Sequence, residues 1–561
     1  MSTKTRILKV LSLLLVIAML AACAPATPAA TESAQPAAPA ADQASAAAPA
    51  EPAGPIYGGT IVVATGAGGP YTVNFSPFSP TTVVLARNLI HEPLILFDSA
   101  HPTVTNYWLA ESYDLAEDLM SITFNLRQGV KWSDGEDFNA DDVVFTFELT
   151  QANPGLDHWS VLPYMAGVEK VDDYTVKITL NKAFSLAPIT FGGVNIVPEH
   201  IWSTVEDPLL FTNENPVGTG PFTQVAVASP EVIEICKNPN YWQEGKPYID
   251  CIRYRSFNSN DTADLAIING EIEWGNAFIS DIENTYVAAS EDNNVADWTN
   301  GIPVNLYMNH TKAPMSDLAF RIAFSQAINF DELLTLITDG RSSPATVSGL
   351  QLSLADAWLS DAAVAKGKET GFRVYDPEAA KAGLEAAGYK DVDGDGYREM
   401  PDGSPMVIKG TVVGAWTDFV AVLQYLSQYL QIVGIKYEIN AVDIGQAFGS
   451  LMGAGYDTAI WFGTAGVTPW DNYRNQLDSR LITEQGAMGQ AYARWSDPET
   501  DALLDEFVTT ADKDQQFAVL EKLQLKYVEN AINLPLFTRF TTYEYNTRRF
   551  TGFPTDENYY A

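Results

Sequence analysis

Apolar and polar residues follow two different periods along this chain, and the mixture predicts a fold of helices and strands. Ile122, Phe124 and Leu126 alternate with polar residues, which is typical of a half-buried strand. In two other segments apolar residues recur every three or four positions, which predicts amphipathic helices. These stripes are Ala319, Ala323, Ala327, Phe330 and Leu334, followed by Phe419, Leu423, Leu426, Leu430 and Val433. Both are interpreted as core-facing surfaces rather than ligand sites.

Turn and capping residues mark where several elements begin and end. Asn139 is predicted to cap a helix that carries Asp142 at its third position. Asp376-Pro377 opens another helix, and Gly388 closes it. A strand is predicted over Thr60 to Ala64. Strand and helix signals alternate over the whole body of the chain, so the predicted fold class is α/β.

One apolar run fits neither period. It extends from Val10 to Leu20 after three basic residues, and it is too short to span a bilayer stably. This arrangement predicts a secretory signal peptide over residues 1–22. Leu20-Ala21-Ala22-Cys23 resembles the bacterial lipobox, which implies that Cys23 is acylated and becomes the mature N-terminus. Residues 23–56 are rich in Ala and Pro and lack aromatic residues, so this lipidated segment is expected to act as a linker to the membrane.

Composition restricts the partners of the remaining body. About 500 residues are enough for two or three domains, and 46% hydrophobic residues indicate a globular protein. A formal charge of −37 repels phosphate backbones, so nucleic-acid binding is not expected. The charge is interpreted as a means of keeping an extracytoplasmic protein soluble, with attraction of a cationic ligand as the alternative.

Two cysteines remain in the predicted mature body. Cys236 and Cys251 both lie in alternating segments that read as strands, and export leads to a compartment where disulfides persist. If these strands pair antiparallel, the two cysteines are candidates for a disulfide. Sequence alone leaves the free thiols as an equal alternative, because the geometry of the pair is not visible.

A search for catalytic motifs finds no candidate residue. The histidines do not share metal-ligand spacing on one helix, and neither a nucleophile elbow nor a P-loop is present. The Gly66 to Gly69 loop faintly suggests dinucleotide binding, but Pro70 and the turns beyond it leave no helix N-terminus for a pyrophosphate. No spacing singles out a glycosidase carboxylate pair. The chain is therefore not expected to be an enzyme, although a secreted glycoside or peptide hydrolase stays open as an alternative.

One acidic segment has the spacing of a calcium loop. Oxygen ligands stand at positions 1, 3 and 5, glycine at position 6 and a carboxylate at position 12, although the last residue is Asp where Glu is usual. The candidate ligands are Asp391, Asp393, Asp395 and Asp402. The alternative is a solvated turn of Asp and Gly residues. No cofactor is expected to be required, and calcium here would be a structural ion.

Several segments, in order, resemble the solute-binding protein family 5, the receptors of oligopeptide, dipeptide and nickel ABC importers. The resemblance rests on Phe124-Asn125-Leu126-Arg127-Gln128-Gly129-Val130-Lys131-Trp132-Ser133-Asp134-Gly135, on Asn215-Pro216-Val217-Gly218-Thr219-Gly220-Pro221-Phe222, on Asn238-Pro239-Asn240-Tyr241-Trp242 and on Asp317-Leu318-Ala319-Phe320-Arg321. It covers nearly the whole mature chain.

The resemblance implies a two-lobed periplasmic-binding-protein-like fold of type II, cluster C, with a small extra α+β domain. Lobe I would combine residues 57–97, 212–305 and 525–561; the small domain would occupy 98–211, and lobe II 306–524. Gly301-Ile302-Pro303 is the expected hinge between the lobes. A ligand closes such a fold only by binding the closed state more tightly than the open one.

The ligand is less clear than the fold. Peptide receptors of the family carry an acid, shortly after a Tyr-Asp strand, that pairs with the ligand's ammonium group. Here the strand is Tyr456 to Ile460, and the stretch after it, which includes Thr464, has no acid before Asp471. An ammonium group buried without a counter-charge is costly, so Asp471 is the displaced candidate. Trp416, Trp461 and Trp470 give the rival interpretation, a stacking surface for sugar rings, with packing as the alternative for each.

Asn74 is a further polar candidate, because it falls where the family's first strand meets the cleft. The function expected from these observations is that of an extracytoplasmic, monomeric lipoprotein receptor anchored to the cell membrane. It would bind an oligopeptide, or alternatively an oligosaccharide, and deliver it to an ABC permease with cytoplasmic ATPases.

Overall fold

The computed structural model describes residues 54–83, 86–98, 101–102, 104–291 and 294–554. The predicted signal peptide, Cys23 and nearly all of the linker lie outside these residues. Ile56–Ala561 forms one compact unit. Within the described ranges, no helix combines the length and apolarity needed to cross a membrane.

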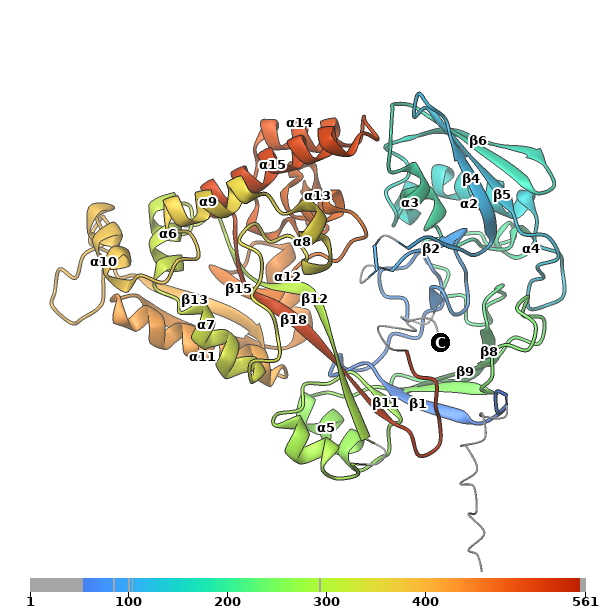
Figure 1. Cartoon of the computed structure of the whole chain (residues 1–561), viewed down its shortest axis with the longest axis horizontal. Helices are drawn as coiled ribbons and strands as arrows, with labels where there is room; N and C mark the ends of the chain where they lie inside the picture. The colour runs from blue at the N-terminus through green and yellow to red at the C-terminus, as the bar shows by residue number, and fades with distance from the viewer. Residues whose placement is uncertain (1–53, 84–85, 99–100, 103, 292–293, 555–561) are drawn as a thin grey trace, which may run out of the picture. The chain divides into compact units, whose positions relative to one another are not determined.

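A sheet of ten strands forms the frame of this unit (Figure 1). In spatial order the strands are β14 (Lys436–Val442), β13 (Val407–Val413), β15 (Thr458–Phe462), β12 (Asn294–Met308), β18 (Asn533–Asn546), β11 (Trp274–Gly275), β1 (Thr60–Ala64), β10 (Cys251–Arg255), β9 (Val232–Lys237) and β8 (Phe222–Ala228). The first three strands belong to lobe II and the last five to lobe I. The sheet is therefore shared by both lobes.

The long antiparallel strands β12 and β18 connect the lobes. Their register shifts between Asn300 and Pro303, which is the segment where the sequence places the hinge. Such an irregularity interrupts the ladder of hydrogen bonds and increases the local twist. The chain therefore passes between the lobes twice, on neighbouring strands, at a point where the sheet is irregular.

Lobe II surrounds its three strands with helices. They are α6 (Leu318–Gln326), α7 (Phe330–Thr338), α8 (Leu352–Trp358), α9 (Asp361–Thr370), α10 (Pro377–Ala386), α11 (Thr417–Ile432), α12 (Ile444–Met452), α13 (Pro469–Leu477), α14 (Pro498–Phe507) and α15 (Lys513–Glu529). The expected end of lobe II at residue 524 falls inside α15. This helix is continuous, so the lobe extends to Glu529 and the chain leaves it through β18.

The small domain has a sheet of its own, and in the sequence it lies between the first two segments of lobe I. Its strands, in spatial order, are β4 (Ala110–Leu115), β5 (Ser121–Leu126), β7 (Thr175–Leu180) and β6 (Met165–Asp172), and its helices are α2 (Ala140–Ala152), α3 (Ala187–Gly192) and α4 (Glu199–Trp202). Lobe I adds the helix α5 (Asn260–Ile268) and the π-helical turn η3 (Glu283–Val287). Two short ribbons pair β2 (Ile95–Leu96) with β3 (Asn106–Tyr107), and β16 (Ile482–Thr483) with β17 (Gly486–Ala487).

The patterned segments form the predicted elements, with one correction. The strands at 60–64 and 121–126, the capping box of Asn139 and Asp142, and the helices α10 and α11 are confirmed. The stripe from Ala319 to Leu334 is not one helix but two. Asn329 separates them, because its side chain accepts a hydrogen bond from Glu332 N and caps α7.

Neighbouring antiparallel strands carry the two cysteines. Cys236 on β9 stands directly opposite Cys251 on β10, and a disulfide joins them.

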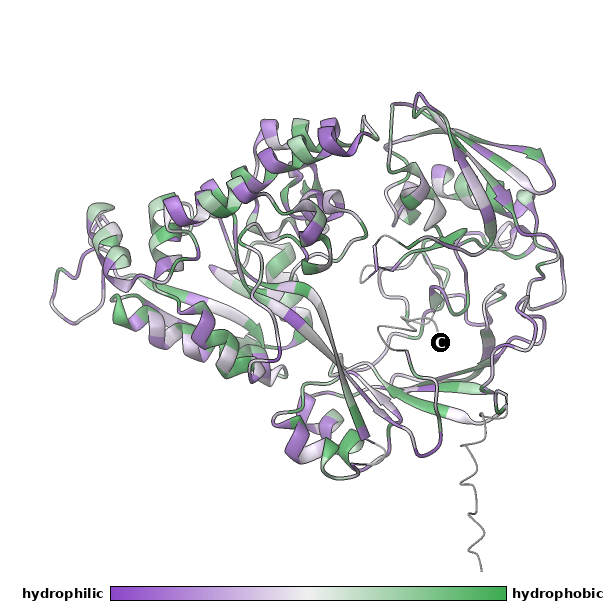
Figure 2. Cartoon of the chain, viewed as in Figure 1, coloured by the Kyte–Doolittle hydropathy of each residue, from purple (hydrophilic) through white to green (hydrophobic). Residues whose placement is uncertain are grey.

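Hydrophobic residues fill the interior of the sheets and one side of the helices, whose outer sides are hydrophilic (Figure 2). The largest buried cluster runs without interruption from the small domain into lobe II. These two parts share a core although they are far apart in sequence.

Candidate functional site

A cavity of about 270 Å³ lies between the lobes. Lobe I contributes the loop Thr65–Gly68 after β1, Asn260 at the start of α5 and the turn Asn276–Phe278 after β11. Lobe II contributes the junction of β13 with α11, the end of β15 and part of α7. Phe537 and Arg539, on the connecting strand β18, complete the wall. The cavity thus exists only where segments of both lobes come together.

The glycine-rich loop of lobe I is shaped by a close backbone contact. Gly66 has φ of +78°, and a Cβ atom at this position would stand 2.7 Å from the carbonyl oxygen of Asn276. Only glycine fits both the left-handed conformation and the short approach. The loop that weakly suggested a dinucleotide site therefore serves as part of the cavity wall.

Trp416 connects the two sides of the cavity. It stands at the N-cap position of α11, directly after β13, and its Nε1 donates a hydrogen bond to the Ala67 carbonyl oxygen at 3.2 Å. This bond joins lobe II to lobe I. Its indole ring also packs against Phe462, with ring centroids 5.3 Å apart, and against Phe419 at 5.6 Å. Trp416 is the one predicted ligand residue that lines the cavity.

The other two candidate tryptophans face elsewhere. Trp461 lies on β15 behind Trp416, with its ring between Trp416 at 5.0 Å and Phe448 at 6.3 Å. Trp470 is only 6% exposed, and its Nε1 donates to the Leu504 carbonyl oxygen at 3.0 Å. Of the three tryptophans only Trp416 lines the cavity, and a stacking surface that includes all three stays a prediction. Trp461 and Trp470 have different surroundings because β15 ends and α13 begins between them.

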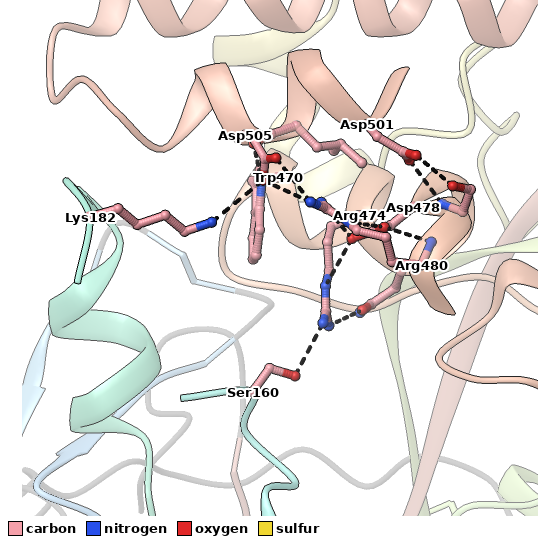
Figure 3. A network of polar contacts seen from close by, with 11 residues as sticks. Ser160, Lys182, Trp470, Arg474, Asp478, Arg480, Asp501 and Asp505 are labelled. Carbon is pink, nitrogen blue, oxygen red and sulfur yellow. Dashed lines mark hydrogen bonds and ion pairs between the residues drawn. The ribbon is translucent and has the colours of Figure 1, made fainter. Parts of the chain in front are cut away.

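Trp470 instead belongs to a contact between lobe II and the small domain (Figure 3). Its ring packs edge-on against Phe184 of the small domain, with centroids 6.2 Å apart, and the Arg474 guanidinium lies over it at 5.7 Å. The same guanidinium donates to Ser160 Oγ at 3.2 Å. Trp470 therefore packs between lobe II and the small domain and does not line the cavity.

Asp471 and Thr464 are also occupied by local structure. Asp471 is the third residue of α13, and its carboxylate accepts hydrogen bonds from Thr468 N at 3.0 Å and Thr468 Oγ1 at 2.9 Å. Burial raises the pKa of Asp471, and the bonds from Thr468 oppose that rise. Thr464 Oγ1 donates to Gln490 inside lobe II. Neither side chain lines the cavity, and their contact with a ligand stays a prediction.

Asn74 is likewise a structural residue. It is 8% exposed, its Oδ1 accepts from Ser76 N at 2.9 Å, and its Nδ2 donates to Ser79 Oγ at 3.0 Å. These bonds stabilise the turn that follows β1, as asparagine side chains commonly do. Asn74 is not among the residues that line the cavity, and its role as a ligand contact stays a prediction.

The charged residues of the cavity were missed by the sequence analysis. Asp418 lies in the first turn of α11, two positions after Trp416, and Arg539 lies on β18. A carboxylate just after a strand-to-helix junction is a signal that could have drawn attention to Asp418. Arg539 has no comparable signal, because its place in the cavity depends on the pairing of β18 with β12.

The predicted calcium loop brings three of its four carboxylates together. Asp391, Asp393 and Asp395 are exposed, and one oxygen of each lies within 4.8 Å of the others. Asp402 is not part of this group, and its role as the twelfth ligand stays a prediction. Its carboxylate accepts from Ser404 N and Oγ at a turn closed by the pairing of Glu399 with Pro405, which directs the chain away from the loop. Calcium binding by the remaining three stays a prediction.

Comparison with known proteins gives this fold a context. The model of the bacterial extracellular solute-binding proteins, family 5 Middle, matches residues 105–481. A Brucella ovis protein, provisionally named a peptide-binding protein of an ABC transporter, is 30% identical over 355 residues, which is 61% of this chain and 64% of that protein. The glutathione-binding protein of Salmonella typhi is 30% identical over 358 residues, 62% of this chain and 63% of that protein. The alignments thus span somewhat less than two thirds of these relatives.

A solved structure covers more of the chain. The periplasmic oligopeptide-binding protein of Thermotoga maritima, crystallised with mannohexaose, superposes with a TM-score of 0.81 at 26% identity. The superposition covers 90% of this chain and 94% of that one. Such coverage includes both lobes and the small domain, and it agrees with the two-lobed α/β fold expected from the sequence.

Proposed function

Because the chain belongs to the bacterial extracellular solute-binding proteins of family 5, we propose that it is the receptor of an ABC importer and that it captures a peptide between its lobes. The observation that carries the proposal is the cavity whose wall comes from both lobes, with the bond from Trp416 to Ala67 across it. A ligand held by both walls stabilises the closed arrangement relative to the open one. The names of the Brucella and Salmonella relatives, peptide-binding and glutathione-binding, support a peptide as the ligand.

An oligosaccharide is the second candidate ligand. The Thermotoga neighbour is described as an oligopeptide-binding protein, yet its crystal holds mannohexaose, which favours this alternative. Against it, only Trp416 of the three candidate tryptophans borders the cavity, although phenylalanine rings also line it, and a volume of about 270 Å³ leaves little room for several sugar rings. Peptide therefore stands first and oligosaccharide second.

Membrane attachment and delivery complete the proposed role. Acylated Cys23 and the linker would hold the folded body near a permease whose cytoplasmic ATPases drive transport. In cells, Cys23→Ala should move the protein from the membrane fraction to the soluble extracytoplasmic fraction. Retention in the membrane fraction would contradict lipid anchoring and would leave the binding function unaffected.

Thermal melts against ligand panels test the binding function directly. The purified chain would be melted with di- to hexapeptides, with glutathione, and with α-linked and β-linked oligosaccharides. A ligand at a hundredfold excess over its Kd stabilises the native state by about 2.7 kcal/mol, which is readily detected. Stabilisation by peptides supports the proposal. Stabilisation by sugars alone replaces peptide with the second candidate, and stabilisation by neither contradicts both.

Turnover separates the receptor from a secreted hydrolase. A receptor binds a stoichiometric amount of ligand and releases it unchanged, whereas a hydrolase produces fragments that accumulate with time. Chromatography of the peptide after prolonged incubation is expected to recover the starting peptide. Cleavage that disappears on changing one acid, while binding persists, would instead establish a hydrolase.

A further inference from the structure

Two opposite charges face the cavity between the lobes. Of the residues that form its wall in the described chain, Asp418 and Arg539 are the charged ones. They come from different elements, α11 and the connecting strand β18. Both are partly enclosed by the lobes. The arrangement gives the cavity an acidic position and a basic position rather than a single sign of charge.

The guanidinium of Arg539 contacts an aromatic ring, while the carboxylate of Asp418 shares the cavity with it without forming an ion pair. Its guanidinium carbon lies 4.4 Å from the centroid of the Phe462 ring, which is a cation–π contact. Within the described residues, its guanidinium makes no hydrogen bond and no ion pair. A guanidinium has five N–H donors, and those of the partly buried Arg539 are left to solvent or to a ligand in the cavity. Burial lowers the pKa of Arg539, yet arginine stays charged at neutral pH.

Asp418 is placed to accept a cation. It lies in the first turn of α11, where the partial positive charge of the helix end stabilises its carboxylate. Its Oδ1 accepts one long hydrogen bond, 3.4 Å, from Asn260 Nδ2 of lobe I. Burial raises the pKa of Asp418, and the charge of Arg539 opposes this rise. No ion pair joins the two residues in the described part of the chain, so they do not neutralise each other by direct contact.

Apolar groups line the wall near these two charges. Phe419, Phe462 and Phe537 line the cavity together with Trp416. A cavity of about 270 Å³ lies just below the usual range for small-molecule sites, which begins at roughly 300 Å³. The space between the charges therefore suits a short ligand with an apolar side chain rather than a long chain.

We propose that Arg539 binds the carboxylate of the ligand and Asp418 its ammonium group, so that the ligand is a short zwitterionic peptide with both termini inside the cavity. This inference rests on the proposed peptide-binding function and specifies it. It assigns the ammonium group to α11 rather than to the segment after β15, where Asp471 is already used as a helix cap. It also explains how Arg539 acquires an acceptor when the cavity is filled.

Blocked peptides test the inference on the unmodified protein. A peptide that stabilises the full chain in the melts would be measured by calorimetry as the free peptide, as its C-terminal amide and as its N-acetyl derivative. Each block removes one charge and should weaken binding at least tenfold, because a hydrogen bond to a charged group is worth about 1.5–3 kcal/mol. Blocking that changes Kd less than threefold at both ends would overturn the inference.

Variants then assign each end of the peptide. In Arg539→Gln, the amide and the free acid should bind with equal affinity, while the N-acetyl derivative still binds at least tenfold more weakly. Asp418→Asn should show the opposite pattern. Asp402→Asn, in an exposed turn outside the cavity, and Arg253→Gln, on β10, are matched controls that should keep both penalties. If Arg539→Gln keeps the full penalty for amidation, the assignment of Arg539 is wrong.

The two levels of the proposal fail separately. If no peptide stabilises or binds the wild-type chain, the peptide function itself fails, and the charge assignment fails with it. If free peptides bind but both blocks are tolerated, the function stands and the assignment fails. Should Arg539→Gln not fold, Arg539→Lys keeps the charge and loses the two-pronged geometry. It is then expected to weaken the free peptide more than the amide, and an equal effect on both would contradict the assignment.

Discussion

Some residues that look like ligand-binding residues in the sequence have local structural roles in the folded chain. Asp471 was attractive as an ammonium anchor because it is the first acid after β15. In the structure it is the third residue of α13 and bonds to Thr468. A Thr followed three positions later by an acid is a helix-capping signature, and it explains Asp471 without any ligand. Trp470, the residue before it, is buried and packs against its neighbours.

Trp470 and Trp416 should therefore respond differently to substitution. Trp470→Phe keeps an aromatic ring but removes the indole N–H that donates to the Leu504 carbonyl oxygen. We expect a loss of about 1 kcal/mol in the free energy of unfolding and a ligand Kd within twofold of wild type. Trp416→Ala removes part of the cavity wall and the bond between the lobes, and should weaken the same ligand at least fivefold. Calorimetry and denaturant unfolding of both variants measure these effects. A tenfold loss of affinity in Trp470→Phe would contradict this assignment.

Asp264 on α5 is a second residue whose surroundings predict a measurable effect. Its Oδ1 is buried and, within the described residues, accepts no hydrogen bond. Burial, together with the charges of Asp261 and Asp418, raises its pKa to about 7. Its pKa in the unfolded chain is near 3.9. The stability linked to this group is therefore complete below about pH 4 and is lost as the pH rises through about 7.

Asp264→Asn should remove this pH dependence. Relative to wild type, the variant should gain melting temperature from pH 5 to about pH 7 and keep a nearly constant advantage from there to pH 8.5, because Asn cannot ionise. Thermal melts across this range measure the difference between the two proteins. Asp356→Asn, at an exposed position on α8, is the control and should show a constant difference. A constant difference for Asp264→Asn as well would contradict its buried, ionisable character.

At the scale of elements, hydrophobic periodicity predicts several helices and strands correctly, but it does not predict which residues line the cavity. The stripe over 419–433 and the alternation over 122–126 correspond to α11 and β5, because a helix or strand must bury one face whatever the rest of the chain does. Asn329 divides the other stripe by a capping bond that periodicity does not reveal. The cavity draws on separate segments from Thr65 to Arg539, so its composition depends on how strands pair across the whole sheet.

The disulfide between β9 and β10 is the element with the clearest energetic prediction. The two cysteines are 15 positions apart, and a loop of about that size corresponds to about 3 kcal/mol of stabilisation through the unfolded chain. Cys236→Ser with Cys251→Ser should lower the free energy of unfolding by about this amount in urea. Reduction of the wild type should reproduce the effect and should leave the double variant unchanged. Equal midpoints for the oxidised wild type and the double variant would show that the bond contributes nothing.

Contacts at the cavity and away from it hold the whole molecule in this arrangement. Trp416 joins lobe II to lobe I at the cavity. A second contact, between the small domain and lobe II, includes the ion pair of Lys182 with Asp505 at 3.8 Å (Figure 3). It also includes the packing of Phe184 on Trp470 and the bond from Ser185 N to the Val508 carbonyl oxygen at 2.8 Å. A ligand in the cavity and this second contact would favour the same closed arrangement.

Weakening the second contact should shorten the lifetime of the complex. Lys182→Ala combined with Arg474→Ala removes the charged side chains of the contact, keeps the backbone bond from Ser185 to Val508, and leaves the cavity wall intact. Exposed ion pairs contribute about 1 kcal/mol or less, so the ligand should dissociate roughly two- to fivefold faster. Lys381→Ala, which removes an ion pair within α10, is the control. Stopped-flow dissociation measures both, and an unchanged rate in the double variant would show that the contact does not depend on closure.

The central claim is that the chain binds one peptide between its lobes and releases it unchanged. Native mass spectrometry of the protein after incubation with a pool of short peptides, followed by release and identification of the bound species, tests it most directly. We predict one peptide per chain, recovered with its intact mass and with both termini free. Recovery of cleavage fragments, or of no peptide while an oligosaccharide from a parallel pool is retained, would contradict the claim.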